Sequence, residues 1–529
     1  MKILIADAVD KKVADLFLNA GFKCDYKAGI SKEEISEIIS EYHGLVVRST
    51  TQVTAELIEK AKNLRIVGRA GAGVDNINVN ACTKKGILVM NTPGGNTIST
   101  AEHTCALILS IARWVPSAFH DVKNGKWERK KWVGTELDNK VIGVIGLGKI
   151  GKEVCKRMQS FGMKTIGYDP FLSKEAAAEL NIELFSVEEI YKRANFITFH
   201  TPLSPETKYL LNIESLNLLQ KGVKIINCAR GGIVEEKAVL EGIRQNIIGG
   251  YAADVLEIEP PVFTEDILKS EKVIISPHLG ASTDEAQEKV AIQIAEQMID
   301  AFGEKDIKGA VNGLALQFTF DPDSKPYVEL SEKLGLILGQ IENSRFQSIE
   351  FCYAGKKPNK YSEIILSAAL KGIFHNKTSE PVNYINAKFF AEEQGVHLSE
   401  LKLTTSQFYS NSIQISIKYG NGIVKTLVGS VFNETDGRLI QIDEYEVELK
   451  LDGDLFIYEN EDRPGMLAQV GAVLASKNIN IGSLVLGRKK LIKKAITVLT
   501  VDSELENDVL GEIVKINGII NAKFVRLNS

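Results

Sequence analysis

The chain has 529 residues, with 63 lysines and arginines against 68 aspartates and glutamates, and 44% of its residues are apolar. This composition is typical of a soluble globular protein and excludes a disordered or collagen-like chain. At roughly 150 residues per domain, the length predicts three or four domains. The net charge of -5 comes from both signs mixed along the chain, so we expect neither nucleic acid nor a membrane as a partner.

The apolar run at residues 3–6 is too short for a signal peptide, and no later stretch approaches about 18 apolar residues. We therefore expect a cytoplasmic protein. Its six cysteines lie far apart with no CxxC pair, which indicates reduced thiols and neither a disulfide framework nor a metal site.

In the first 95 residues, short runs of aliphatic and β-branched residues alternate with amphipathic stretches. The runs predict strands at 2–6, 44–48, 64–68 and 87–90, and the stretches predict helices at 11–20, 32–39 and 54–61. Such alternation is typical of an α/β domain with a parallel sheet.

Ser99 and Glu102 have the spacing of a capping box, which predicts a long apolar helix from there to about Trp114. A second α/β series follows, with strands predicted at 140–145, 165–168, 196–199, 224–227, 250–253 and 273–275. We expect the helix at 283–302 to cross back and complete the first domain. The prediction is two Rossmann-like or flavodoxin-like parallel-sheet domains, a discontinuous one at 1–95 plus 284–310 and a second at 96–283.

The last 220 or so residues have a different pattern. Residues 311–450 mix helical and strand periodicities, which indicates an α+β domain without a more specific fold. Residues 451–529 follow the order strand, helix, strand, strand, helix, strand, which is typical of a ferredoxin-like unit.

The sharpest local signal is VIGVIGLGKIG at 141–151, a hydrophobic strand that leads into GxGxxG and a helical pattern. Gly146 permits the tight turn, Gly148 lets backbone amides approach a pyrophosphate, and Gly151 permits close packing of the helix on the strand. The phosphates would lie at the helix N-terminus, where free N–H groups and the dipole favour an anion. The alternative is a glycine-rich packing turn without a ligand.

The strand after this helix ends in Asp169, 18 residues beyond Gly151. A carboxylate at this position can accept hydrogen bonds from the adenosine ribose, and it would repel a 2′-phosphate. The sequence therefore predicts NAD rather than NADP as the cofactor.

Three polar residues follow strands of the second domain: Arg230, Glu259 and His278. We expect them to converge, because the carboxyl ends of strands in an open α/β sheet face the ligand crevice. Hydride transfer from a secondary alcohol requires a group that takes the hydroxyl proton, and histidine has a pKa near neutrality. Glu259 would hold the ring and raise its pKa, and Arg230 would bind a substrate carboxylate or polarise the carbonyl.

A structural role for the same residues remains open, with His278 capping a helix and Glu259 paired with Arg230. The other histidines lack a comparable partner pattern, and we expect them to be structural or surface residues: His43, His103, His120, His200, His375 and His397.

Arg48 and Arg69 follow strands of the first domain, so the same strand-end rule places both beside the gap between the first two domains. Two guanidiniums fit a phosphate better than they fit a bare short acid. The gap is therefore expected to hold a small phosphorylated substrate.

Together these features resemble the D-isomer-specific 2-hydroxyacid dehydrogenases, in particular the long members that oxidise phosphoglycerate. The resemblance covers nearly the whole chain. Its markers are GRAGAGVDN at 68–76, the glycine turn at 146–151, NCARGG at 227–232, EPP at 259–261 and SPHLGA at 276–281.

The resemblance implies a proton-transferring His278 supported by Glu259, with Arg230 binding the substrate. It implies cofactor contacts at Gly146, Gly148, Lys149, Ile150, Gly151, Asp169, Thr201, Cys228, Arg230, Asp254, His278 and Gly280. Beside Arg48 and Arg69, the substrate contacts it implies are Gly71, Gly73, Asn96 and Arg129. Arg129 lies in the basic run at 126–131, which in relatives reaches a partner subunit's cleft. Taken alone, this run fits a solvated basic face.

The last unit resembles an ACT domain, a regulatory fold that binds amino acids at subunit contacts. The motifs that carry this resemblance are EDRPGML at 461–467 and NINI at 478–481. The resemblance implies L-serine as a candidate effector, held by Asp462, Gly465 and Asn480. Residues 311–450 resemble the intervening domain of the long members.

We therefore predict an NAD-dependent enzyme that oxidises 3-phospho-D-glycerate to 3-phosphooxypyruvate, the first step of L-serine synthesis. We expect it to act on a small-molecule substrate as a homo-oligomer, a dimer or a tetramer. One rival is a dehydrogenase of glyoxylate, hydroxypyruvate or another short 2-oxo acid, which would not need Arg48 and Arg69 for a phosphate. Another is an NAD-sensing binding protein, which would keep the Gly146 turn but need no effector domain.

Overall fold

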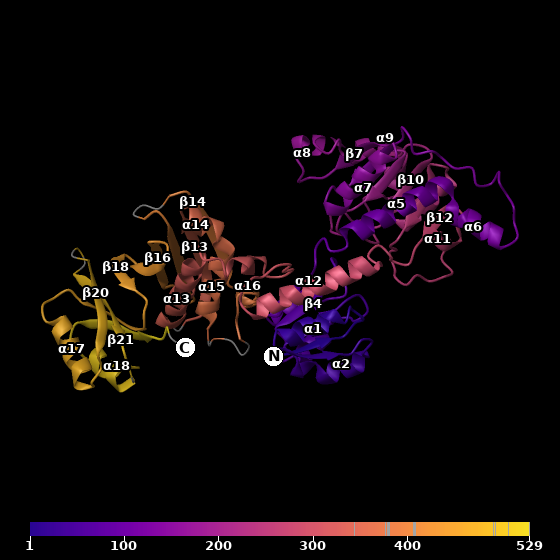
Figure 1. Ribbon diagram of the computed structural model, residues 1–529. Helices are drawn as coiled ribbons and strands as arrows, with labels where there is room; N and C mark the ends of the chain where they lie inside the picture. The colour runs from indigo at the N-terminus through magenta and orange to yellow at the C-terminus, as the bar shows by residue number, and fades with distance from the viewer. Residues whose placement is uncertain are drawn as a thin grey trace.

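The computed structural model describes residues 1–527 except 343, 376, 378–380, 406–408, 490, 492 and 506. It is an elongated molecule of four units, each with its own sheet, in which the first unit lies between the second and the third, and the fourth lies at the end beyond the third (Figure 1). The first two sheets are parallel, the third is mixed and the fourth is antiparallel. The predicted fold class is confirmed.

The first sheet has five parallel strands in the order β2-β1-β3-β4-β5. The strands are β1 (Lys2–Ile5), β2 (Lys23–Tyr26), β3 (Gly44–Val47), β4 (Ile66–Arg69) and β5 (Leu88–Met90). The helices between them are α1 (Lys12–Asn19), α2 (Lys32–Ile38), α3 (Ala55–Lys60) and α4 (Val79–Lys84). Every residue of β3 and β5 is buried, as expected for strands covered on both faces. Arg48 and Arg69 lie at the carboxyl ends of neighbouring strands, β3 and β4.

The second sheet has seven parallel strands in the order β12-β11-β10-β9-β6-β7-β8. They are β6 (Val141–Ile145), β7 (Lys164–Tyr168), β8 (Glu183–Leu184), β9 (Phe196–Phe199), β10 (Val223–Asn227), β11 (Ile248–Ala253) and β12 (Val273–Ile275). Its helices are α5 (Thr97–Arg113), α6 (Val115–Lys123), α7 (Lys149–Ser160), α8 (Lys174–Ala178), α9 (Val187–Arg193), α10 (Glu236–Arg244) and α11 (Asp266–Lys269). The strand order reverses between β6 and β9, and ligands of doubly wound sheets bind at such switch points.

The predicted capping box at Ser99 and Glu102 is wrong. Helix α5 already begins at Thr97, after Asn96, and its N-cap has no side-chain hydrogen bond. Ser99 lies inside the helix, where its hydroxyl donates to the carbonyl of Gly280 at 2.8 Å. The hydroxyl that the local pattern assigned to the helix cap bonds instead to a residue that is distant in the sequence.

Helix α12 (Asp284–Phe302) runs from the second unit back onto the first (Figure 1). It packs on α1 and β4, and Ile294, Met298 and Phe302 join the core of the first sheet. The β3 and β4 residues beneath it are Gly44 and Gly68, where any Cβ would meet these side chains. The missing side chains allow the helix to lie close against the sheet.

The third unit has a six-stranded sheet in the order β14-β13-β15-β16-β17-β18. Its strands are β13 (Phe346–Ala354), β14 (His397–Leu403), β15 (Ser412–Tyr419), β16 (Val424–Phe432), β17 (Asp436–Ile442) and β18 (Tyr445–Lys450). Its helices are α13 (Lys325–Ile341), α14 (Lys356–Lys360), α15 (Ser362–Phe374) and α16 (Ala387–Glu393). Helices α13 and α15 pack closely on each other through small residues, since a Cβ at Gly335 or Gly339 would meet the backbone of α15.

The fourth unit alternates strands and helices as predicted, in an antiparallel sheet of order β20-β21-β19-β22. Its elements are β19 (Asp454–Glu461), α17 (Met466–Ser476), β20 (Ile481–Lys489), β21 (Lys494–Val501), α18 (Asn507–Val514) and β22 (Ile519–Val525). The two helices contact each other, and their apolar residues pack with Phe456 and Leu499 of the sheet.

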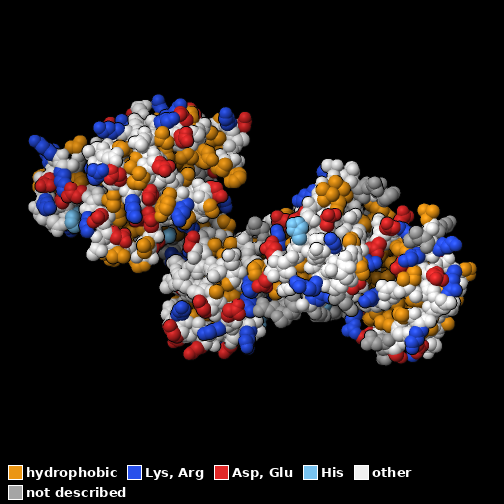
Figure 2. Space-filling view, turned by 180° about the vertical axis from the view of Figure 1, so that it is seen from behind, with side chains coloured by type: hydrophobic (Ala, Val, Ile, Leu, Met, Phe, Trp, Pro, Cys, Tyr) orange, Lys and Arg blue, Asp and Glu red, His pale blue; other side chains and the backbone are white. Residues whose placement is uncertain are grey.

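Acidic and basic side chains are interspersed over the face drawn in Figure 2. No described helix is long and apolar enough to cross a membrane. Within the described ranges, no group of three or more His, Cys, Asp or Glu residues could hold a metal ion.

Candidate active site

The glycine turn joins β6 to α7 at the switch point of the second sheet. Gly146 has a φ of +97°, and a Cβ there would lie 2.6 Å from the carbonyl oxygen of His200. A Cβ at Gly151 would meet the carbonyl oxygen of Gly146, so the helix can lie against the turn only with glycine there. Gly148, the N-cap of α7, has no other described atom within 4 Å of its Cβ position. The space beside the N-cap of α7 is therefore open at Gly148.

Groups around this space fit a dinucleotide. Asp169 lies directly after β7, where its carboxylate accepts the amides of Leu147 and Phe171, each at 2.9 Å. The hydroxyl of Thr201 is buried and has no hydrogen-bond partner among the described residues. The Lys149 ammonium, in the first turn of α7, donates to the carbonyl oxygen of Pro93 at 3.3 Å. A helix N-terminus, a carboxylate and a hydroxyl without a described partner thus lie around one turn, the kinds of group that bind the phosphates and ribose of a dinucleotide.

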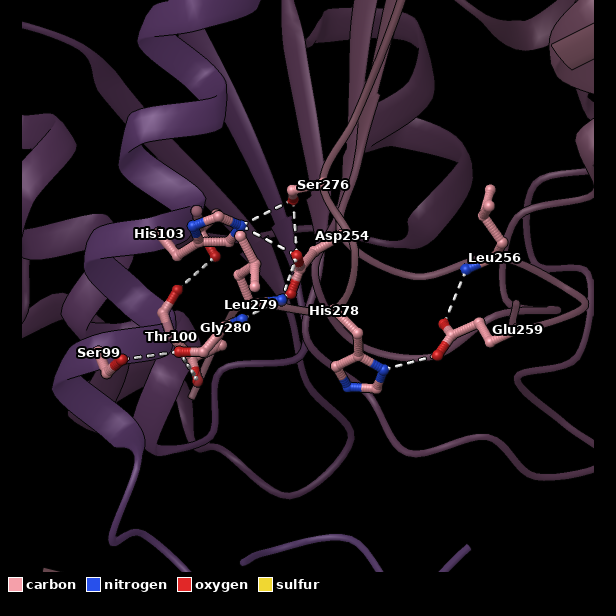
Figure 3. Close-up of polar contacts among 11 residues, drawn as sticks. Ser99, Thr100, His103, Asp254, Leu256, Glu259, Ser276, His278, Leu279 and Gly280 are labelled. Atoms are coloured by element: carbon pink, nitrogen blue, oxygen red, sulfur yellow. Dashed lines mark hydrogen bonds and ion pairs between the residues drawn. The ribbon is translucent and has the colours of Figure 1, made fainter. Parts of the chain in front are cut away.

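His278 and Glu259 come together as predicted, with Nδ1 of the imidazole 2.7 Å from Oε2 of the carboxylate (Figure 3). The other carboxylate oxygen accepts the amide of Leu256 at 3.0 Å, which fixes Glu259. The alternative pairing of Glu259 with Arg230 is wrong, because Arg230 contacts Asp75 instead. His278 caps no helix either, since the cap of α12 is Thr283.

Each member of this pair shifts the pKa of the other. The hydrogen bond that His278 donates to Glu259 raises the pKa of His278, against the opposite effect of burial. Burial by itself would raise the pKa of Glu259, but the bonds from His278 and the Leu256 amide outweigh it and lower that pKa. Glu259 is therefore ionised at neutral pH, and His278 is a stronger base than free histidine.

Asp254, at the end of β11, holds the loop that carries His278 (Figure 3). Its carboxylate accepts the amides of Leu279 and Gly280 at 2.7 Å each. It also contacts His103 of α5, with 3.0 Å between Oδ1 and Nε2. The sequence pattern did not indicate this partner of His103, which we expected to be a structural or surface residue.

Arg230 reaches from the second unit to the first. Its Nε lies 3.2 Å from a carboxylate oxygen of Asp75, and its Nη1 donates to the carbonyl of Ala229 at 2.7 Å. A Cβ at Gly73 would meet the guanidinium, so this glycine leaves room for Arg230. Asp75 belongs to the 68–76 marker, but the sequence pattern assigned it no role.

Arg69 and Arg48 are held together by Asn76. The side-chain carbonyl of Asn76 accepts a hydrogen bond from Nε of Arg69 at 2.8 Å, and its side-chain amide donates to the backbone carbonyl of Arg48 at 3.0 Å. Burial lowers the pKa of Arg69, and the charges that also act on it include Asp75, Arg230 and Arg48. The three predicted arginines therefore lie in one electrostatic neighbourhood.

The loop after β3 is fixed by Asp7, a buried carboxylate that follows β1. It accepts the amides of Arg48 at 2.6 Å and Thr51 at 3.0 Å, and the Thr51 hydroxyl at 2.6 Å. Several donors on one carboxylate make a rigid support. Asp7 was missed because nothing in its local sequence indicates which loop it binds.

The other predicted substrate and cofactor residues have different surroundings. Asn96 stands at the N-cap position of α5 without a capping bond, and its side-chain amide donates to the hydroxyl of Thr100 at 3.2 Å. Gly71 lies against the guanidinium of Arg69. Cys228 is buried and Ile150 is half-buried in the core beneath the glycine turn. Arg129 is exposed on the segment after α6, and among the described residues no contact joins it to Arg48 or Arg69.

The predicted effector residues lie in the fourth unit. Gly465 has a φ of +88° and caps α17. Both oxygens of Asp462 accept Nε of Arg488, at 2.9 and 3.0 Å. The amide of Asn480 donates to Asp502 at 2.8 Å. A carboxylate and a guanidinium thus lie side by side near the start of α17.

Three family models match the chain. The NAD binding domain of D-isomer specific 2-hydroxyacid dehydrogenases matches residues 105–280, the D-3-phosphoglycerate dehydrogenase intervening domain matches 323–443, and the ACT domain matches 454–518.

Relatives match over the whole length. The D-3-phosphoglycerate dehydrogenase of Archaeoglobus fulgidus is 38% identical over 529 residues, which cover all of both chains. That of Bacillus subtilis is 36% identical over 501 residues, 94% of this chain and 95% of its own. Among solved structures, the TT0316 protein of Thermus thermophilus is 28% identical with a TM-score of 0.54, and the match covers 59% of this chain and 100% of that protein. The chain belongs to the D-3-phosphoglycerate dehydrogenases of the D-isomer specific 2-hydroxyacid dehydrogenase family.

Proposed function

We propose that this enzyme oxidises 3-phospho-D-glycerate to 3-phosphooxypyruvate with NAD⁺, the first step of L-serine synthesis. The observation that carries the proposal is that charged side chains of the first and second units act on one another. A histidine–carboxylate pair, His278 and Glu259, lies within the electrostatic range of Arg230, which itself acts on Arg69. The names of the full-length relatives support the same substrate.

Bound NAD⁺ supplies the acceptor for the hydride that leaves C2 of the substrate. His278 accepts the proton of the C2 hydroxyl at Nε2, the ring nitrogen that points away from Glu259 (Figure 3). The ionised Glu259 stabilises the imidazolium that forms. Loss of the hydride and the proton converts the alcohol into the ketone, and the proton later leaves His278 for solvent.

Two kinds of guanidinium contact hold the substrate in this proposal. Arg230 binds the carboxylate next to the reacting carbon, where a planar fork matches the two oxygens. Arg48 and Arg69 bind the phosphate, at the ends of neighbouring strands and tied to each other by Asn76. Arg129 would add to this site only from a partner subunit, because in its own chain it lies on an exposed segment.

The proposal assigns substrate recognition to residues 1–95 plus 284–310 and cofactor binding to residues 96–283. The residues assigned to NAD are Gly146, Gly148, Lys149, Ile150, Gly151, Asp169, Thr201, Cys228, Asp254 and Gly280. Asp169 favours NAD over NADP, since its carboxylate would repel a 2′-phosphate.

The ACT domain fits regulation by a small molecule. We propose L-serine as the effector and a homo-oligomer in the cytoplasm as the working form. Asp462 could accept hydrogen bonds from the ammonium of an amino acid, and the neighbouring Arg488 could bind its carboxylate.

A spectrophotometric assay of NADH formation tests the function. Purified protein is given 3-phospho-D-glycerate, D-glycerate, D-lactate or D-2-hydroxyglutarate, each with and without L-serine. We expect kcat/KM for 3-phospho-D-glycerate to exceed that for D-glycerate by at least roughly 100-fold, because only the phosphorylated acid uses Arg48 and Arg69. Equal kcat/KM values for the two acids would contradict the proposed substrate.

A further inference from the structure

His278 has a backbone φ of +55°, in the left-handed region that non-glycine residues adopt when surrounding contacts impose it. Those contacts come from Asp254. Its backbone carbonyl accepts the amide of His278 at 3.0 Å, and its carboxylate accepts the amides of Leu279 and Gly280. The direction of the imidazole therefore depends on where the Asp254 carboxylate lies.

The Asp254 carboxylate is held in turn by two side chains, and it is only 2% exposed. Nε2 of His103 lies 3.0 Å from Oδ1 of Asp254 and 2.9 Å from Oγ of Ser276, whose hydroxyl donates to the same Oδ1 at 2.6 Å (Figure 3). Burial alone would raise the pKa of Asp254, but the hydrogen bonds from His103, Ser276 and Leu279 outweigh it and lower that pKa. The carboxylate thus stays ionised and fully bonded.

Helix α5 holds the other end of the same loop. The hydroxyls of Ser99 and Thr100 donate to the carbonyl of Gly280 at 2.8 and 3.1 Å. Residues three and four positions apart share one face of a helix, so these hydroxyls and His103 contact the loop together. In this loop, Ser99 and Thr100 contact only the backbone carbonyl of Gly280. His103 contacts the carboxylate of Asp254, which fixes the residues after His278.

We propose that His103 is a positioning residue of the reaction, which holds Asp254 and so fixes the loop that aims His278 at the substrate. The inference rests on the proposed role of His278 as the proton acceptor. His103 lies on a helix of the second unit, whereas Arg48 and Arg69 belong to the first, and this separates its effect from phosphate binding.

Removing the imidazole of His103, which donates to Asp254, should therefore affect turnover more than substrate binding. In His103→Leu we expect kcat to fall roughly 10- to 100-fold, as misplaced catalytic groups do, and KM for 3-phospho-D-glycerate to stay within about twofold. The charged groups that act on His278 are Glu259, Asp254 and Arg230. Because Asp254 loses a donor, its charge acts more strongly on His278, and the acid limb of the kcat profile should move up by roughly half a pH unit.

The experiment compares wild type with His103→Leu, His103→Gln and Ser276→Ala in the full chain. Each is measured for kcat, KM, the pH profile of NADH formation, NADH affinity by fluorescence titration and the thermal unfolding midpoint. His103→Gln retains an N–H donor and should recover most of kcat and the wild-type acid limb. The control is His120→Leu, on the exposed face of α6, which should match wild type in all five measurements.

His278→Ala, measured in parallel, separates the two hypotheses. If His278→Ala is inactive and His103→Leu has the wild-type kcat and acid limb, the inference is overturned and the proposed function stands. Equal losses in His103→Leu and His103→Gln would also overturn it, because the hydrogen bond would then not matter. If His278→Ala turns over normally, the proposed mechanism itself fails. Should His103→Leu unfold below the assay temperature, Ser276→Ala decides by the same criteria.

Discussion

The guanidinium of Arg230 lies 3.2 Å from the carboxylate of Asp75, and this ion pair joins the NAD-binding unit to the unit that carries Arg48 and Arg69. Asp75 is 69% exposed, so the pair is worth little to stability. Its consequence is for binding, because a substrate carboxylate held by Arg230, as we propose, would compete with Asp75 for the same guanidinium.

Asp75→Asn should therefore tighten substrate binding. The change removes a competing negative charge without altering the size of the side chain. We expect KM for 3-phospho-D-glycerate to fall roughly two- to fivefold, the range of an exposed ion pair, with kcat changed less than about twofold. Steady-state kinetics at low ionic strength provide the measurement. A rise in KM would show instead that Asp75 orients Arg230 for the substrate.

Asn76→Ala should weaken phosphate recognition specifically. The side chain of Asn76 ties the guanidinium of Arg69 to the backbone of Arg48, and its loss leaves the Arg69 guanidinium less ordered. We expect KM for 3-phospho-D-glycerate to rise roughly 10-fold, because that is the size of effect expected when a hydrogen bond to a charged group is lost. D-glycerate, which lacks the phosphate, is the control substrate, and its kcat/KM should stay within about twofold. A parallel loss for both substrates would indicate general damage to the fold.

Glu259→Gln should shift the pH dependence of oxidation to lower pH. His278 must be neutral to accept a proton, so kcat rises as pH increases through its pKa, which the Glu259 hydrogen bond holds above the ordinary value. Without the carboxylate charge that pKa falls, and the acid limb moves down. Turnover on the plateau should also drop, by roughly 10- to 100-fold, because the imidazolium loses its partner. An acid limb unchanged between pH 5 and 8 would exclude His278 as the titrating base.

Asp169→Ala should reduce the preference for NAD over NADP. The carboxylate at the end of β7 is the group that would meet the ribose hydroxyls. We expect KM for NAD⁺ to rise roughly 10-fold and the ratio of kcat/KM for NAD⁺ over NADP⁺ to fall further, since the repulsion of a 2′-phosphate also disappears. Kinetics with each cofactor at saturating substrate measure the ratio, and an unchanged ratio would place the ribose elsewhere.

The strands that sequence periodicity located best are the ones buried on both sides. The predicted strand at 196–199 coincides with β9, and the one at 44–48 extends one residue beyond β3. Every residue of both strands is buried, and buried parallel strands are short apolar runs. Strand β2 (Lys23–Tyr26) was missed, since it lies at the edge of its sheet, where half-exposed polar side chains replace the apolar pattern. The start of α5 was misplaced because Ser99 bonds to Gly280, a contact that the local sequence does not contain.

The same distinction holds in the active site. The strand-end rule brought His278 and Glu259 together, since both follow strands of one parallel sheet. His103 lies on a helix, and its partner Asp254 is 151 positions away, so no spacing pattern indicates the bond. Asn76 lay within a recognised motif, yet its task depends on the backbone carbonyl of Arg48, 28 positions earlier. The residues that we assign to the substrate could be predicted from the topology of the sheet. The residues that position them could not, because their partners lie far away in the sequence.

The most direct test is the kcat/KM of Arg69→Ala for 3-phospho-D-glycerate and for D-glycerate, with Arg244→Ala on the exposed face of α10 as the matched control. Because Arg69 is assigned to the phosphate, we predict a loss of roughly 100-fold or more for the phosphorylated acid, near wild-type kcat/KM for D-glycerate, and no change in the control. An equal loss for both acids would contradict a phosphate held by Arg69 beside His278.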